Sequence, residues 1–128
     1  GDDFTPQVWK MPETEKDIFD LLAGIAEKGE YHYIVAVIEK VSAFPKQGVV
    51  SVWNFSGNYH GLRMALHGNH IKFKAVPPGV WQRAMGCLTK GDKNVTKRRA
   101  QELFQEIKIT HAIADAILLA EYCRRTSI

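Results

Sequence analysis

Six consecutive apolar residues, nearly all of them β-branched or aromatic, occupy positions 33–38, and Glu39 follows them directly. An apolar run without alternation is typical of a strand that is buried on both faces. We therefore expect a strand that ends at Glu39. No other segment constrains the fold as strongly, because a strand of this kind needs neighbouring strands and covering helices.

Periodicity predicts regular structure elsewhere in the chain. Helices are predicted over 15–27, 49–66, 80–85, 95–107 and 110–122, and a strand is predicted over 71–76. Thr14 and Asp17 form a pair like a capping box before the first helix, and Ser56-Gly57 is the point at which the second helix would break. The alternation of strands with helices predicts an α/β protein whose sheet is at least partly parallel.

Length and composition favour one globular domain over residues 1–128. Hydrophobic residues make up 45% of the chain and charged residues 24%, which excludes disordered, collagen-like and coiled-coil proteins. Cys87 and Cys123 provide neither a disulfide framework nor a metal-binding spacing. Without a signal segment or a long apolar run, the chain is expected to be cytoplasmic and to have no membrane partner. Because it opens on Gly1 rather than Met, we also expect a fragment.

The formal net charge of +3 averages two unlike segments. Residues 1–39 carry nine acids and three bases, whereas residues 40–111 carry twelve bases and three acids. No acid occurs between Lys40 and Gly91. A basic stretch of this length predicts a polyanionic partner, and contacts with nucleic-acid phosphates explain it better than a solvated helix face does.

Candidate DNA-binding residues lie in two places. The first surrounds a polar turn over 90–94 and the start of the next helix, and comprises Lys90, Lys93, Lys97, Arg98 and Arg99. The second is the loop after Glu39, where Phe44 and Lys46 flank Pro45. Phe44 is the candidate for stacking on a base or wedging between base pairs, whereas Trp81 is expected to pack in the core.

Two carboxylates are candidates for a catalytic site. Glu39 follows a strand at the end where open α/β sheets place their ligand sites, although a residue at the start of a loop also pairs with Lys40 or with solvent. Asp115 lies within an almost wholly apolar helix, so we expect it to be buried, with His111 one turn earlier on the same face. A metal ion would offset the cost of burying Asp115, and so would a purely structural pair with His or Arg.

The order of several segments resembles that of the RuvC-like Holliday junction resolvases, particularly the short phage-type members. The matching segments are residues 36–41 (AVIEKV), a glycine-containing helix, 77–86 (PPGVWQRAMG), 93–100 (KNVTKRRA) and 110–122 (THAIADAILLAEY), within a resemblance that runs from about Met11 to Arg125. This resemblance implies an RNase H-like fold with a mixed sheet flanked by helices. It also implies a bacterial or phage-encoded homodimer that cleaves four-way DNA junctions with Mg2+ or Mn2+.

The resemblance further implies roles for individual residues. Glu39 and Asp115 match metal-binding carboxylates of the family, and His111 matches a position where an acid or histidine would bind metal or move a proton. Lys93 and Lys97 fall where the family has lysines that approach the scissile phosphate. Cations held by carboxylates activate a water and stabilise the leaving oxygen, while a lysine offsets charge on the phosphoryl oxygens.

One part of the family pattern has no match in this sequence. The family begins with a strand carrying Gly-Ile-Asp-Pro-Gly or a close variant, whose Asp is a principal metal ligand, and a second strand follows. Asp2 and Asp3 are not embedded in an apolar strand. We therefore expect that the chain lacks the first two strands of the family and one catalytic carboxylate. Such a chain is expected to bind metal weakly, to cleave DNA poorly and to dimerise through an exposed sheet edge.

Two other functions fit the same residues. One is a non-catalytic nucleic-acid-binding module in which Asp115 and His111 have only structural roles. The other is an RNase H-like nuclease that acts on different nucleic acids.

Overall fold

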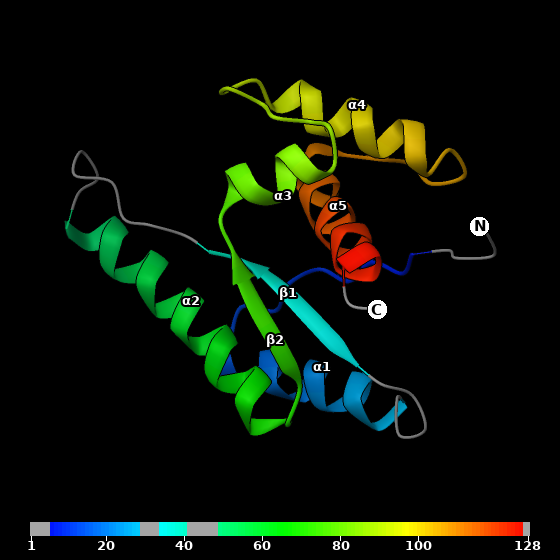
Figure 1. The fold of residues 1–128 in the computed structure, drawn as a ribbon. Helices are drawn as coiled ribbons and strands as arrows, with labels where there is room; N and C mark the ends of the chain where they lie inside the picture. The colour runs from blue at the N-terminus through cyan, green and yellow to red at the C-terminus, as the bar shows by residue number, and fades with distance from the viewer. Residues whose placement is uncertain (1–5, 29–33, 41–48, 127–128) are drawn as a thin grey trace. The chain divides into compact units, whose positions relative to one another are not determined.

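A computed structural model of the chain describes residues 6–28, 34–40 and 49–126, with side chains from residue 59 onward in the last range. These residues form five helices and two strands, in the order α1 (Glu15–Lys28), β1 (Val35–Glu39), α2 (Val49–Gly68), β2 (Lys72–Val76), α3 (Pro78–Ala84), α4 (Lys93–Leu103) and α5 (His111–Thr126) (Figure 1). The predicted α/β class is confirmed.

Strands β1 and β2 form a two-stranded parallel sheet within the described part of the chain (Figure 1). The chain passes through α2 between them, since parallel neighbours need a long crossover connection. Along β2 the burial alternates: Lys72 and Lys74 are exposed, Phe73 is half-buried and Val76 is buried. The strand predicted over 71–76 is therefore confirmed, and β1 ends at Glu39 as expected.

β1 is less buried than its sequence pattern predicts. Ile38 is buried, whereas Val35, Ala36 and Val37 are half-buried. The prediction of a strand buried on both faces is therefore wrong. Because β1 has one strand neighbour among the residues that the structure describes, part of its surface stays accessible.

The helices exist where they were predicted, but their ends differ. α2 is continuous from Val49 to Gly68, so the break expected at Ser56-Gly57 does not occur. α4 starts two residues before the predicted range and ends at Leu103, because Phe104 leaves helical geometry at φ −130°. α3 begins at Pro78, directly after the N-cap residue Pro77, because proline suits the first turn of a helix but not its interior.

Contacts divide the chain into two compact units. Unit 1 comprises the described parts of Gly1–Trp9, Val37–Glu39 and Ala75–Ile128, and unit 2 comprises those of Lys10–Ala36 and Lys40–Lys74. The single domain expected from length stays a prediction, and each unit has packing of its own.

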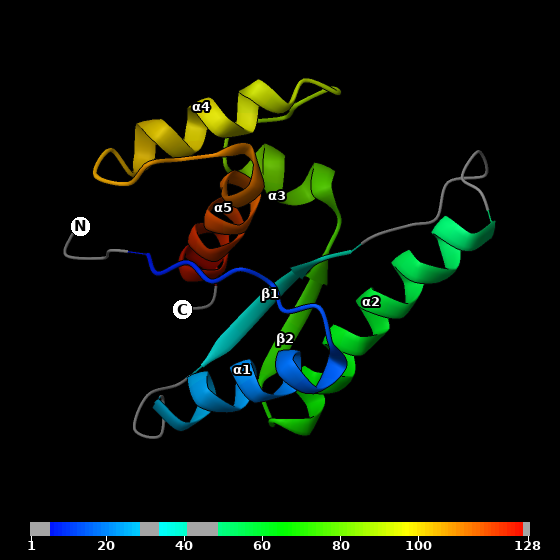
Figure 2. The same ribbon diagram turned by 180° about the vertical axis from the view of Figure 1, so that it is seen from behind.

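In unit 2, α1 packs against α2 (Figure 2). The hydroxyl oxygen of Thr14 accepts a hydrogen bond from the backbone N–H of Asp17 at 3.1 Å, as the predicted cap requires. After the end of α2, the side-chain amide of Asn69 donates to the carbonyl oxygens of Phe19 and Ala65 at 3.2 and 2.9 Å. These bonds tie the end of α2 to α1.

α2 terminates in a Schellman motif. The backbone N–H of Ile71 donates to the carbonyl of Leu66, and that of His70 donates to the carbonyl of His67, both at 3.0 Å. His70 has φ 57°, the left-handed conformation in which glycine is the usual residue.

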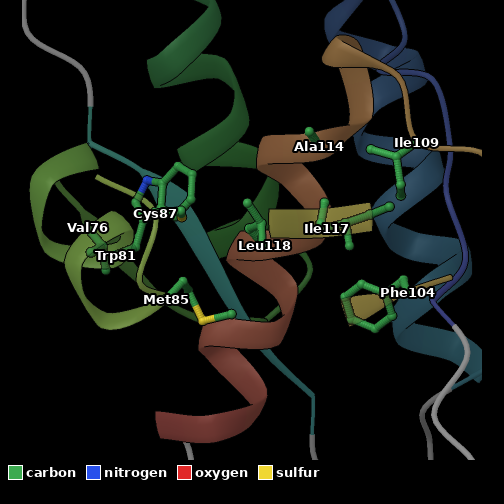
Figure 3. Packing of buried hydrophobic residues seen from close by; sticks show 10 residues of the cluster. Val76, Trp81, Met85, Cys87, Phe104, Ile109, Ala114, Ile117 and Leu118 are labelled. Carbon is green, nitrogen blue, oxygen red and sulfur yellow. The ribbon is translucent and has the colours of Figure 1, made fainter. Parts of the chain in front are cut away.

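In unit 1, α5 packs against α3 and α4. Trp81 and Leu118 are completely buried, which confirms Trp81 as a core residue. The cluster around them, drawn in Figure 3, consists of Val76, Trp81, Met85, Cys87, Ala100, Phe104, Ile109, Ala114, Ile117 and Leu118. This core supports the end of β1, because Val37 packs against it.

Candidate functional site

Glu39 is held at the end of β1 by a core residue of α3. The indole Nε1–H of Trp81 donates a hydrogen bond to Glu39 Oε2 at 3.0 Å. The Trp81 ring is completely buried, so its N–H needs a protein acceptor, and Glu39 supplies one. This bond fixes one oxygen of the half-buried Glu39 carboxylate. No sequence pattern predicts that Trp81 and Glu39 are in contact.

The surroundings of Glu39 raise the pKa of its carboxyl group. Burial raises the pKa of the Glu39 carboxyl above its ordinary value. The hydrogen bond from Trp81 lowers this pKa, and the charge of Asp115 raises it further. A carboxylate with a raised pKa, beside a second acid, is typical of functional sites and also occurs in structural clusters.

Asp115 lies on the exposed face of α5, together with His111. The prediction that Asp115 is buried is wrong. The core side of α5 carries Ala114, Ile117 and Leu118, while the opposite face carries small alanines. Ala120 also belongs to that exposed face. The cost of burial therefore no longer explains a metal at Asp115, but both side chains are accessible to a ligand from solvent.

Glu39 and Asp115 lie in one electrostatic environment within unit 1, although they are far apart in sequence. The charge of Asp115 contributes to raising the pKa of Glu39 and also that of Cys87, whose thiol pKa is raised chiefly by burial and lowered by Arg99. No group of three or more metal-ligating side chains occurs among the described residues. The charge of Asp115 thus acts on Glu39, while no hydrogen bond or ion pair among the described residues joins Asp115 or His111 to Glu39.

The basic residues of α4 differ in their surroundings. Lys93 is the first residue of the helix and is exposed, Lys97 lies one turn later and is half-buried, and Arg98 is exposed. In the part of the chain that the structure describes, none of the three forms an ion pair. Because Lys93 and Lys97 share a face of α4, they can approach the same anion.

Arg99 is engaged within unit 1. Its Nε donates to the carbonyl oxygen of Met85 at 2.8 Å, and its Nη1 pairs with Glu102 at 3.2 Å. The bond to Met85 joins α4 to the end of α3, and the pair with Glu102 lies within α4. Its predicted role in DNA binding stays a prediction, and its observed role is structural.

Lys90 lies in the predicted polar turn, which the structure confirms. Lys90 and Gly91 have φ of 50° and 94°, and the N–H of Asp92 donates to the carbonyl of Thr89 at 3.0 Å, which makes a type I′ turn. Asp92 then caps α4, since its Oδ1 accepts from the N–H of Asn94 at 2.9 Å. The turn presents the exposed Lys90 beside the start of α4. Phe44 and Lys46 lie outside the described residues.

A buried carboxylate that the sequence analysis missed lies near the end of α5. Glu121 accepts from Nε and Nη2 of Arg124 at 2.9 and 2.6 Å, and from Nε of Arg125 at 3.0 Å. The hydrogen bond from Arg124 lowers the pKa of Glu121 most, burial opposes it, and Arg125 lowers it further. The spacing of three and four residues between Glu121 and the two arginines predicts these ion pairs. It does not predict that the Glu121 side chain is buried.

No protein-family model matches this sequence, and a search of curated proteins found no match to it. Within the described residues, no helix is long and apolar enough to cross a membrane.

Proposed function

We propose that this protein is a structure-selective DNA endonuclease of the RuvC-like, RNase H-like type, acting on four-way junctions. The observation that carries the proposal is the place of Glu39 at the carboxyl end of β1, where Trp81 holds its carboxylate and the charge of Asp115 on α5 contributes to raising its pKa. Carboxylates from a strand end and a late helix are the pair that the resemblance implies. The parallel strands β1 and β2 would belong to the RNase H-like sheet.

The donor chemistry of this pair fits Mg2+ or Mn2+. Mg2+ is commonly bound by one or two protein carboxylates, with waters and substrate phosphates completing its shell. Glu39 and Asp115 would hold it, and His111 is accessible on the same face of α5 as Asp115. When bound, the cation would supply water activation and stabilise the leaving oxygen. With two protein carboxylates in the described ranges, weak binding in the absence of DNA is expected.

The chain's own residues would position the substrate. Trp81 fixes one oxygen of Glu39, and among the described residues no side chain hydrogen-bonds to the other. Lys93 and Lys97, on one face of α4, would bind phosphates and offset the charge that develops on phosphoryl oxygens. Lys90 and Arg98 would add contacts to the phosphate backbone of the DNA, because both are exposed and basic.

A cleavage assay on a synthetic four-way junction tests this function. Slow Mn2+-dependent cleavage is expected, and Glu39→Gln and Asp115→Asn should each abolish it. Lys97→Gln should slow it without changing the cut position. Cleavage that survives both carboxylate substitutions would contradict the proposal.

A second function, a non-catalytic nucleic-acid-binding module, is favoured by one observation: no group of three metal-ligating side chains occurs in the described part of the chain. This module would bind junctions without cleaving them, with or without Mn2+. Comparing affinities for a junction, a linear duplex and an RNA–DNA hybrid at one stated salt concentration separates a resolvase from a nuclease for other nucleic acids.

The resemblance also leads us to propose a homodimer, since two active sites would cut a four-way junction symmetrically. Sedimentation at micromolar concentration tests this state. A monomer there would contradict it.

A further inference from the structure

An arginine in unit 2 lies against two aromatic rings. The guanidinium carbon of Arg63 is 5.6 Å from the ring centre of Tyr59 and 5.8 Å from that of Phe73. Cation–π attraction operates at centroid distances up to about 6 Å. Tyr59 precedes Arg63 by one turn of α2, and Phe73 belongs to β2. The guanidinium is therefore restrained from two elements.

His67, one turn beyond Arg63 on α2, also contacts Phe73. Its ring meets that of Phe73 edge-on, with 4.9 Å between ring centres. Tyr59, Arg63 and His67 consequently lie along one stripe of α2. Tyr59, Arg63 and Phe73 are half-buried and His67 is exposed. These four residues are called the Arg63 cluster below.

The Arg63 cluster has no negative charge beside it in sequence. Neither α2 nor β2 contains Asp or Glu, and none occurs between Lys40 and Gly91. Across the described ranges, no carboxylate pairs with Arg63. Lys16, in the acidic α1, illustrates the contrast, because it pairs with Asp20 at 2.7 Å.

A restrained guanidinium without an acidic partner is suited to binding an external anion. A guanidinium has five N–H donors and no acceptor, so ring contacts satisfy its faces but not its edge. A purely structural link between α2 and β2 would be made at lower desolvation cost by an apolar side chain. Because the rings already restrict Arg63, less rotamer entropy is lost when it binds.

We propose that the Arg63 cluster is a further DNA-contact surface, in which Arg63 binds a phosphate of the DNA backbone. This inference rests on the proposed function only for its ligand, DNA, and involves neither the carboxylate pair nor α4. Phosphate binding by a pre-positioned arginine contributes affinity and salt dependence rather than sequence specificity.

Fluorescence anisotropy with a labelled four-way junction and a linear duplex, in EDTA and over a series of salt concentrations, tests the proposal. Arg63→Gln should weaken binding to both DNAs roughly tenfold and reduce the slope of log affinity against log salt by about one. Lys10→Gln is the matched control, because it removes one exposed positive charge from unit 2 within the acidic segment. It should change affinity by less than about twofold.

The outcomes separate this inference from the proposed function. If wild type binds DNA and Arg63→Gln behaves like Lys10→Gln, the inference alone is overturned. A loss of affinity without a change in salt slope would indicate a structural role and also overturn it. If wild type binds neither DNA at low salt, both fail. Should thermal unfolding show that Arg63→Gln does not fold, Arg63→Lys decides: because lysine keeps the positive charge, the slope should stay unchanged, so several-fold weaker binding at wild-type thermal stability supports the proposal, whereas unchanged affinity, or weaker binding with lower stability, overturns it.

Discussion

The buried indole of Trp81 and the half-buried carboxylate of Glu39 are joined by a hydrogen bond of 3.0 Å. This bond connects the first turns of α3 to the last residue of β1. It satisfies a donor that has no access to water and orients the Glu39 carboxylate, whose pKa the charge of Asp115 helps to raise. The packing of unit 1 and the candidate site therefore depend on the same contact.

Trp81→Phe should destabilise the protein. Phenylalanine keeps a ring in the core but removes the donor to a charged acceptor, so the free energy of unfolding should fall by about 1–3 kcal/mol. Urea denaturation followed by circular dichroism measures the change. Trp9→Phe is the control, since Trp9 is 51% exposed. Equal effects of the two substitutions would contradict the assigned role of the Trp81 N–H.

Glu39→Gln should stabilise the protein at neutral pH. Because burial raises the pKa of Glu39, the folded state binds this proton more tightly than the unfolded state does. The resulting stability is present below the unfolded pKa and is lost as pH rises through the folded pKa. The advantage of Glu39→Gln should therefore be largest near pH 7 and shrink toward pH 4, as urea denaturation across this range would show. Glu27→Gln, at an exposed position of α1, is the control, and identical pH profiles of the two variants would contradict the prediction.

Glu121→Gln should have the opposite pH dependence. The hydrogen bond from Arg124 lowers the pKa of Glu121, so its stabilising contribution is present above the unfolded pKa and is lost as pH falls through the folded pKa. The melting temperature should fall by several degrees at pH 7, and the difference from wild type should vanish in acid. Glu102→Gln provides the comparison, because the Glu102 side chain is 55% exposed and that of Glu121 is 4% exposed. An equal loss in the two variants would contradict this account.

His70→Gly should stabilise the end of α2. Glycine adopts the left-handed conformation without the steric cost that His70 bears, for a net gain of about 0.5–1 kcal/mol. His70→Ala retains a Cβ and should give no gain. A gain in the alanine variant would place the effect in the imidazole rather than in the backbone, as thermal unfolding of both variants would reveal.

The elements of the fold could be predicted where local chemistry determines them. The apolar run gives way to a charged residue at Glu39, and β1 ends at that residue. The polar turn before α4 and the cap of α1 are likewise local. How deeply the side chains of β1 are buried depends instead on the elements that pack against the strand. The residues of the run alone do not predict this packing.

Asp115 illustrates why the site was harder to predict than the fold. Its helix is apolar almost all round in sequence, but Ala112, Ala116 and Ala120 lie on the exposed face. An exposed alanine costs little and is a strong helix former, so apolar content overestimates burial. The pairing of Trp81 with Glu39 joins different elements and is set by tertiary packing, which residue spacing does not encode.

Mn2+ titration followed by electron paramagnetic resonance, with protein alone and with added four-way junction, tests most directly whether Glu39 and Asp115 form one cation site. We predict weak binding to the protein alone and tighter binding when DNA is present, because substrate phosphates complete the coordination shell. Glu39→Gln and Asp115→Asn should each remove the tight binding, and Glu102→Gln should leave it unchanged. Tight Mn2+ binding that survives either carboxylate substitution would contradict the shared site.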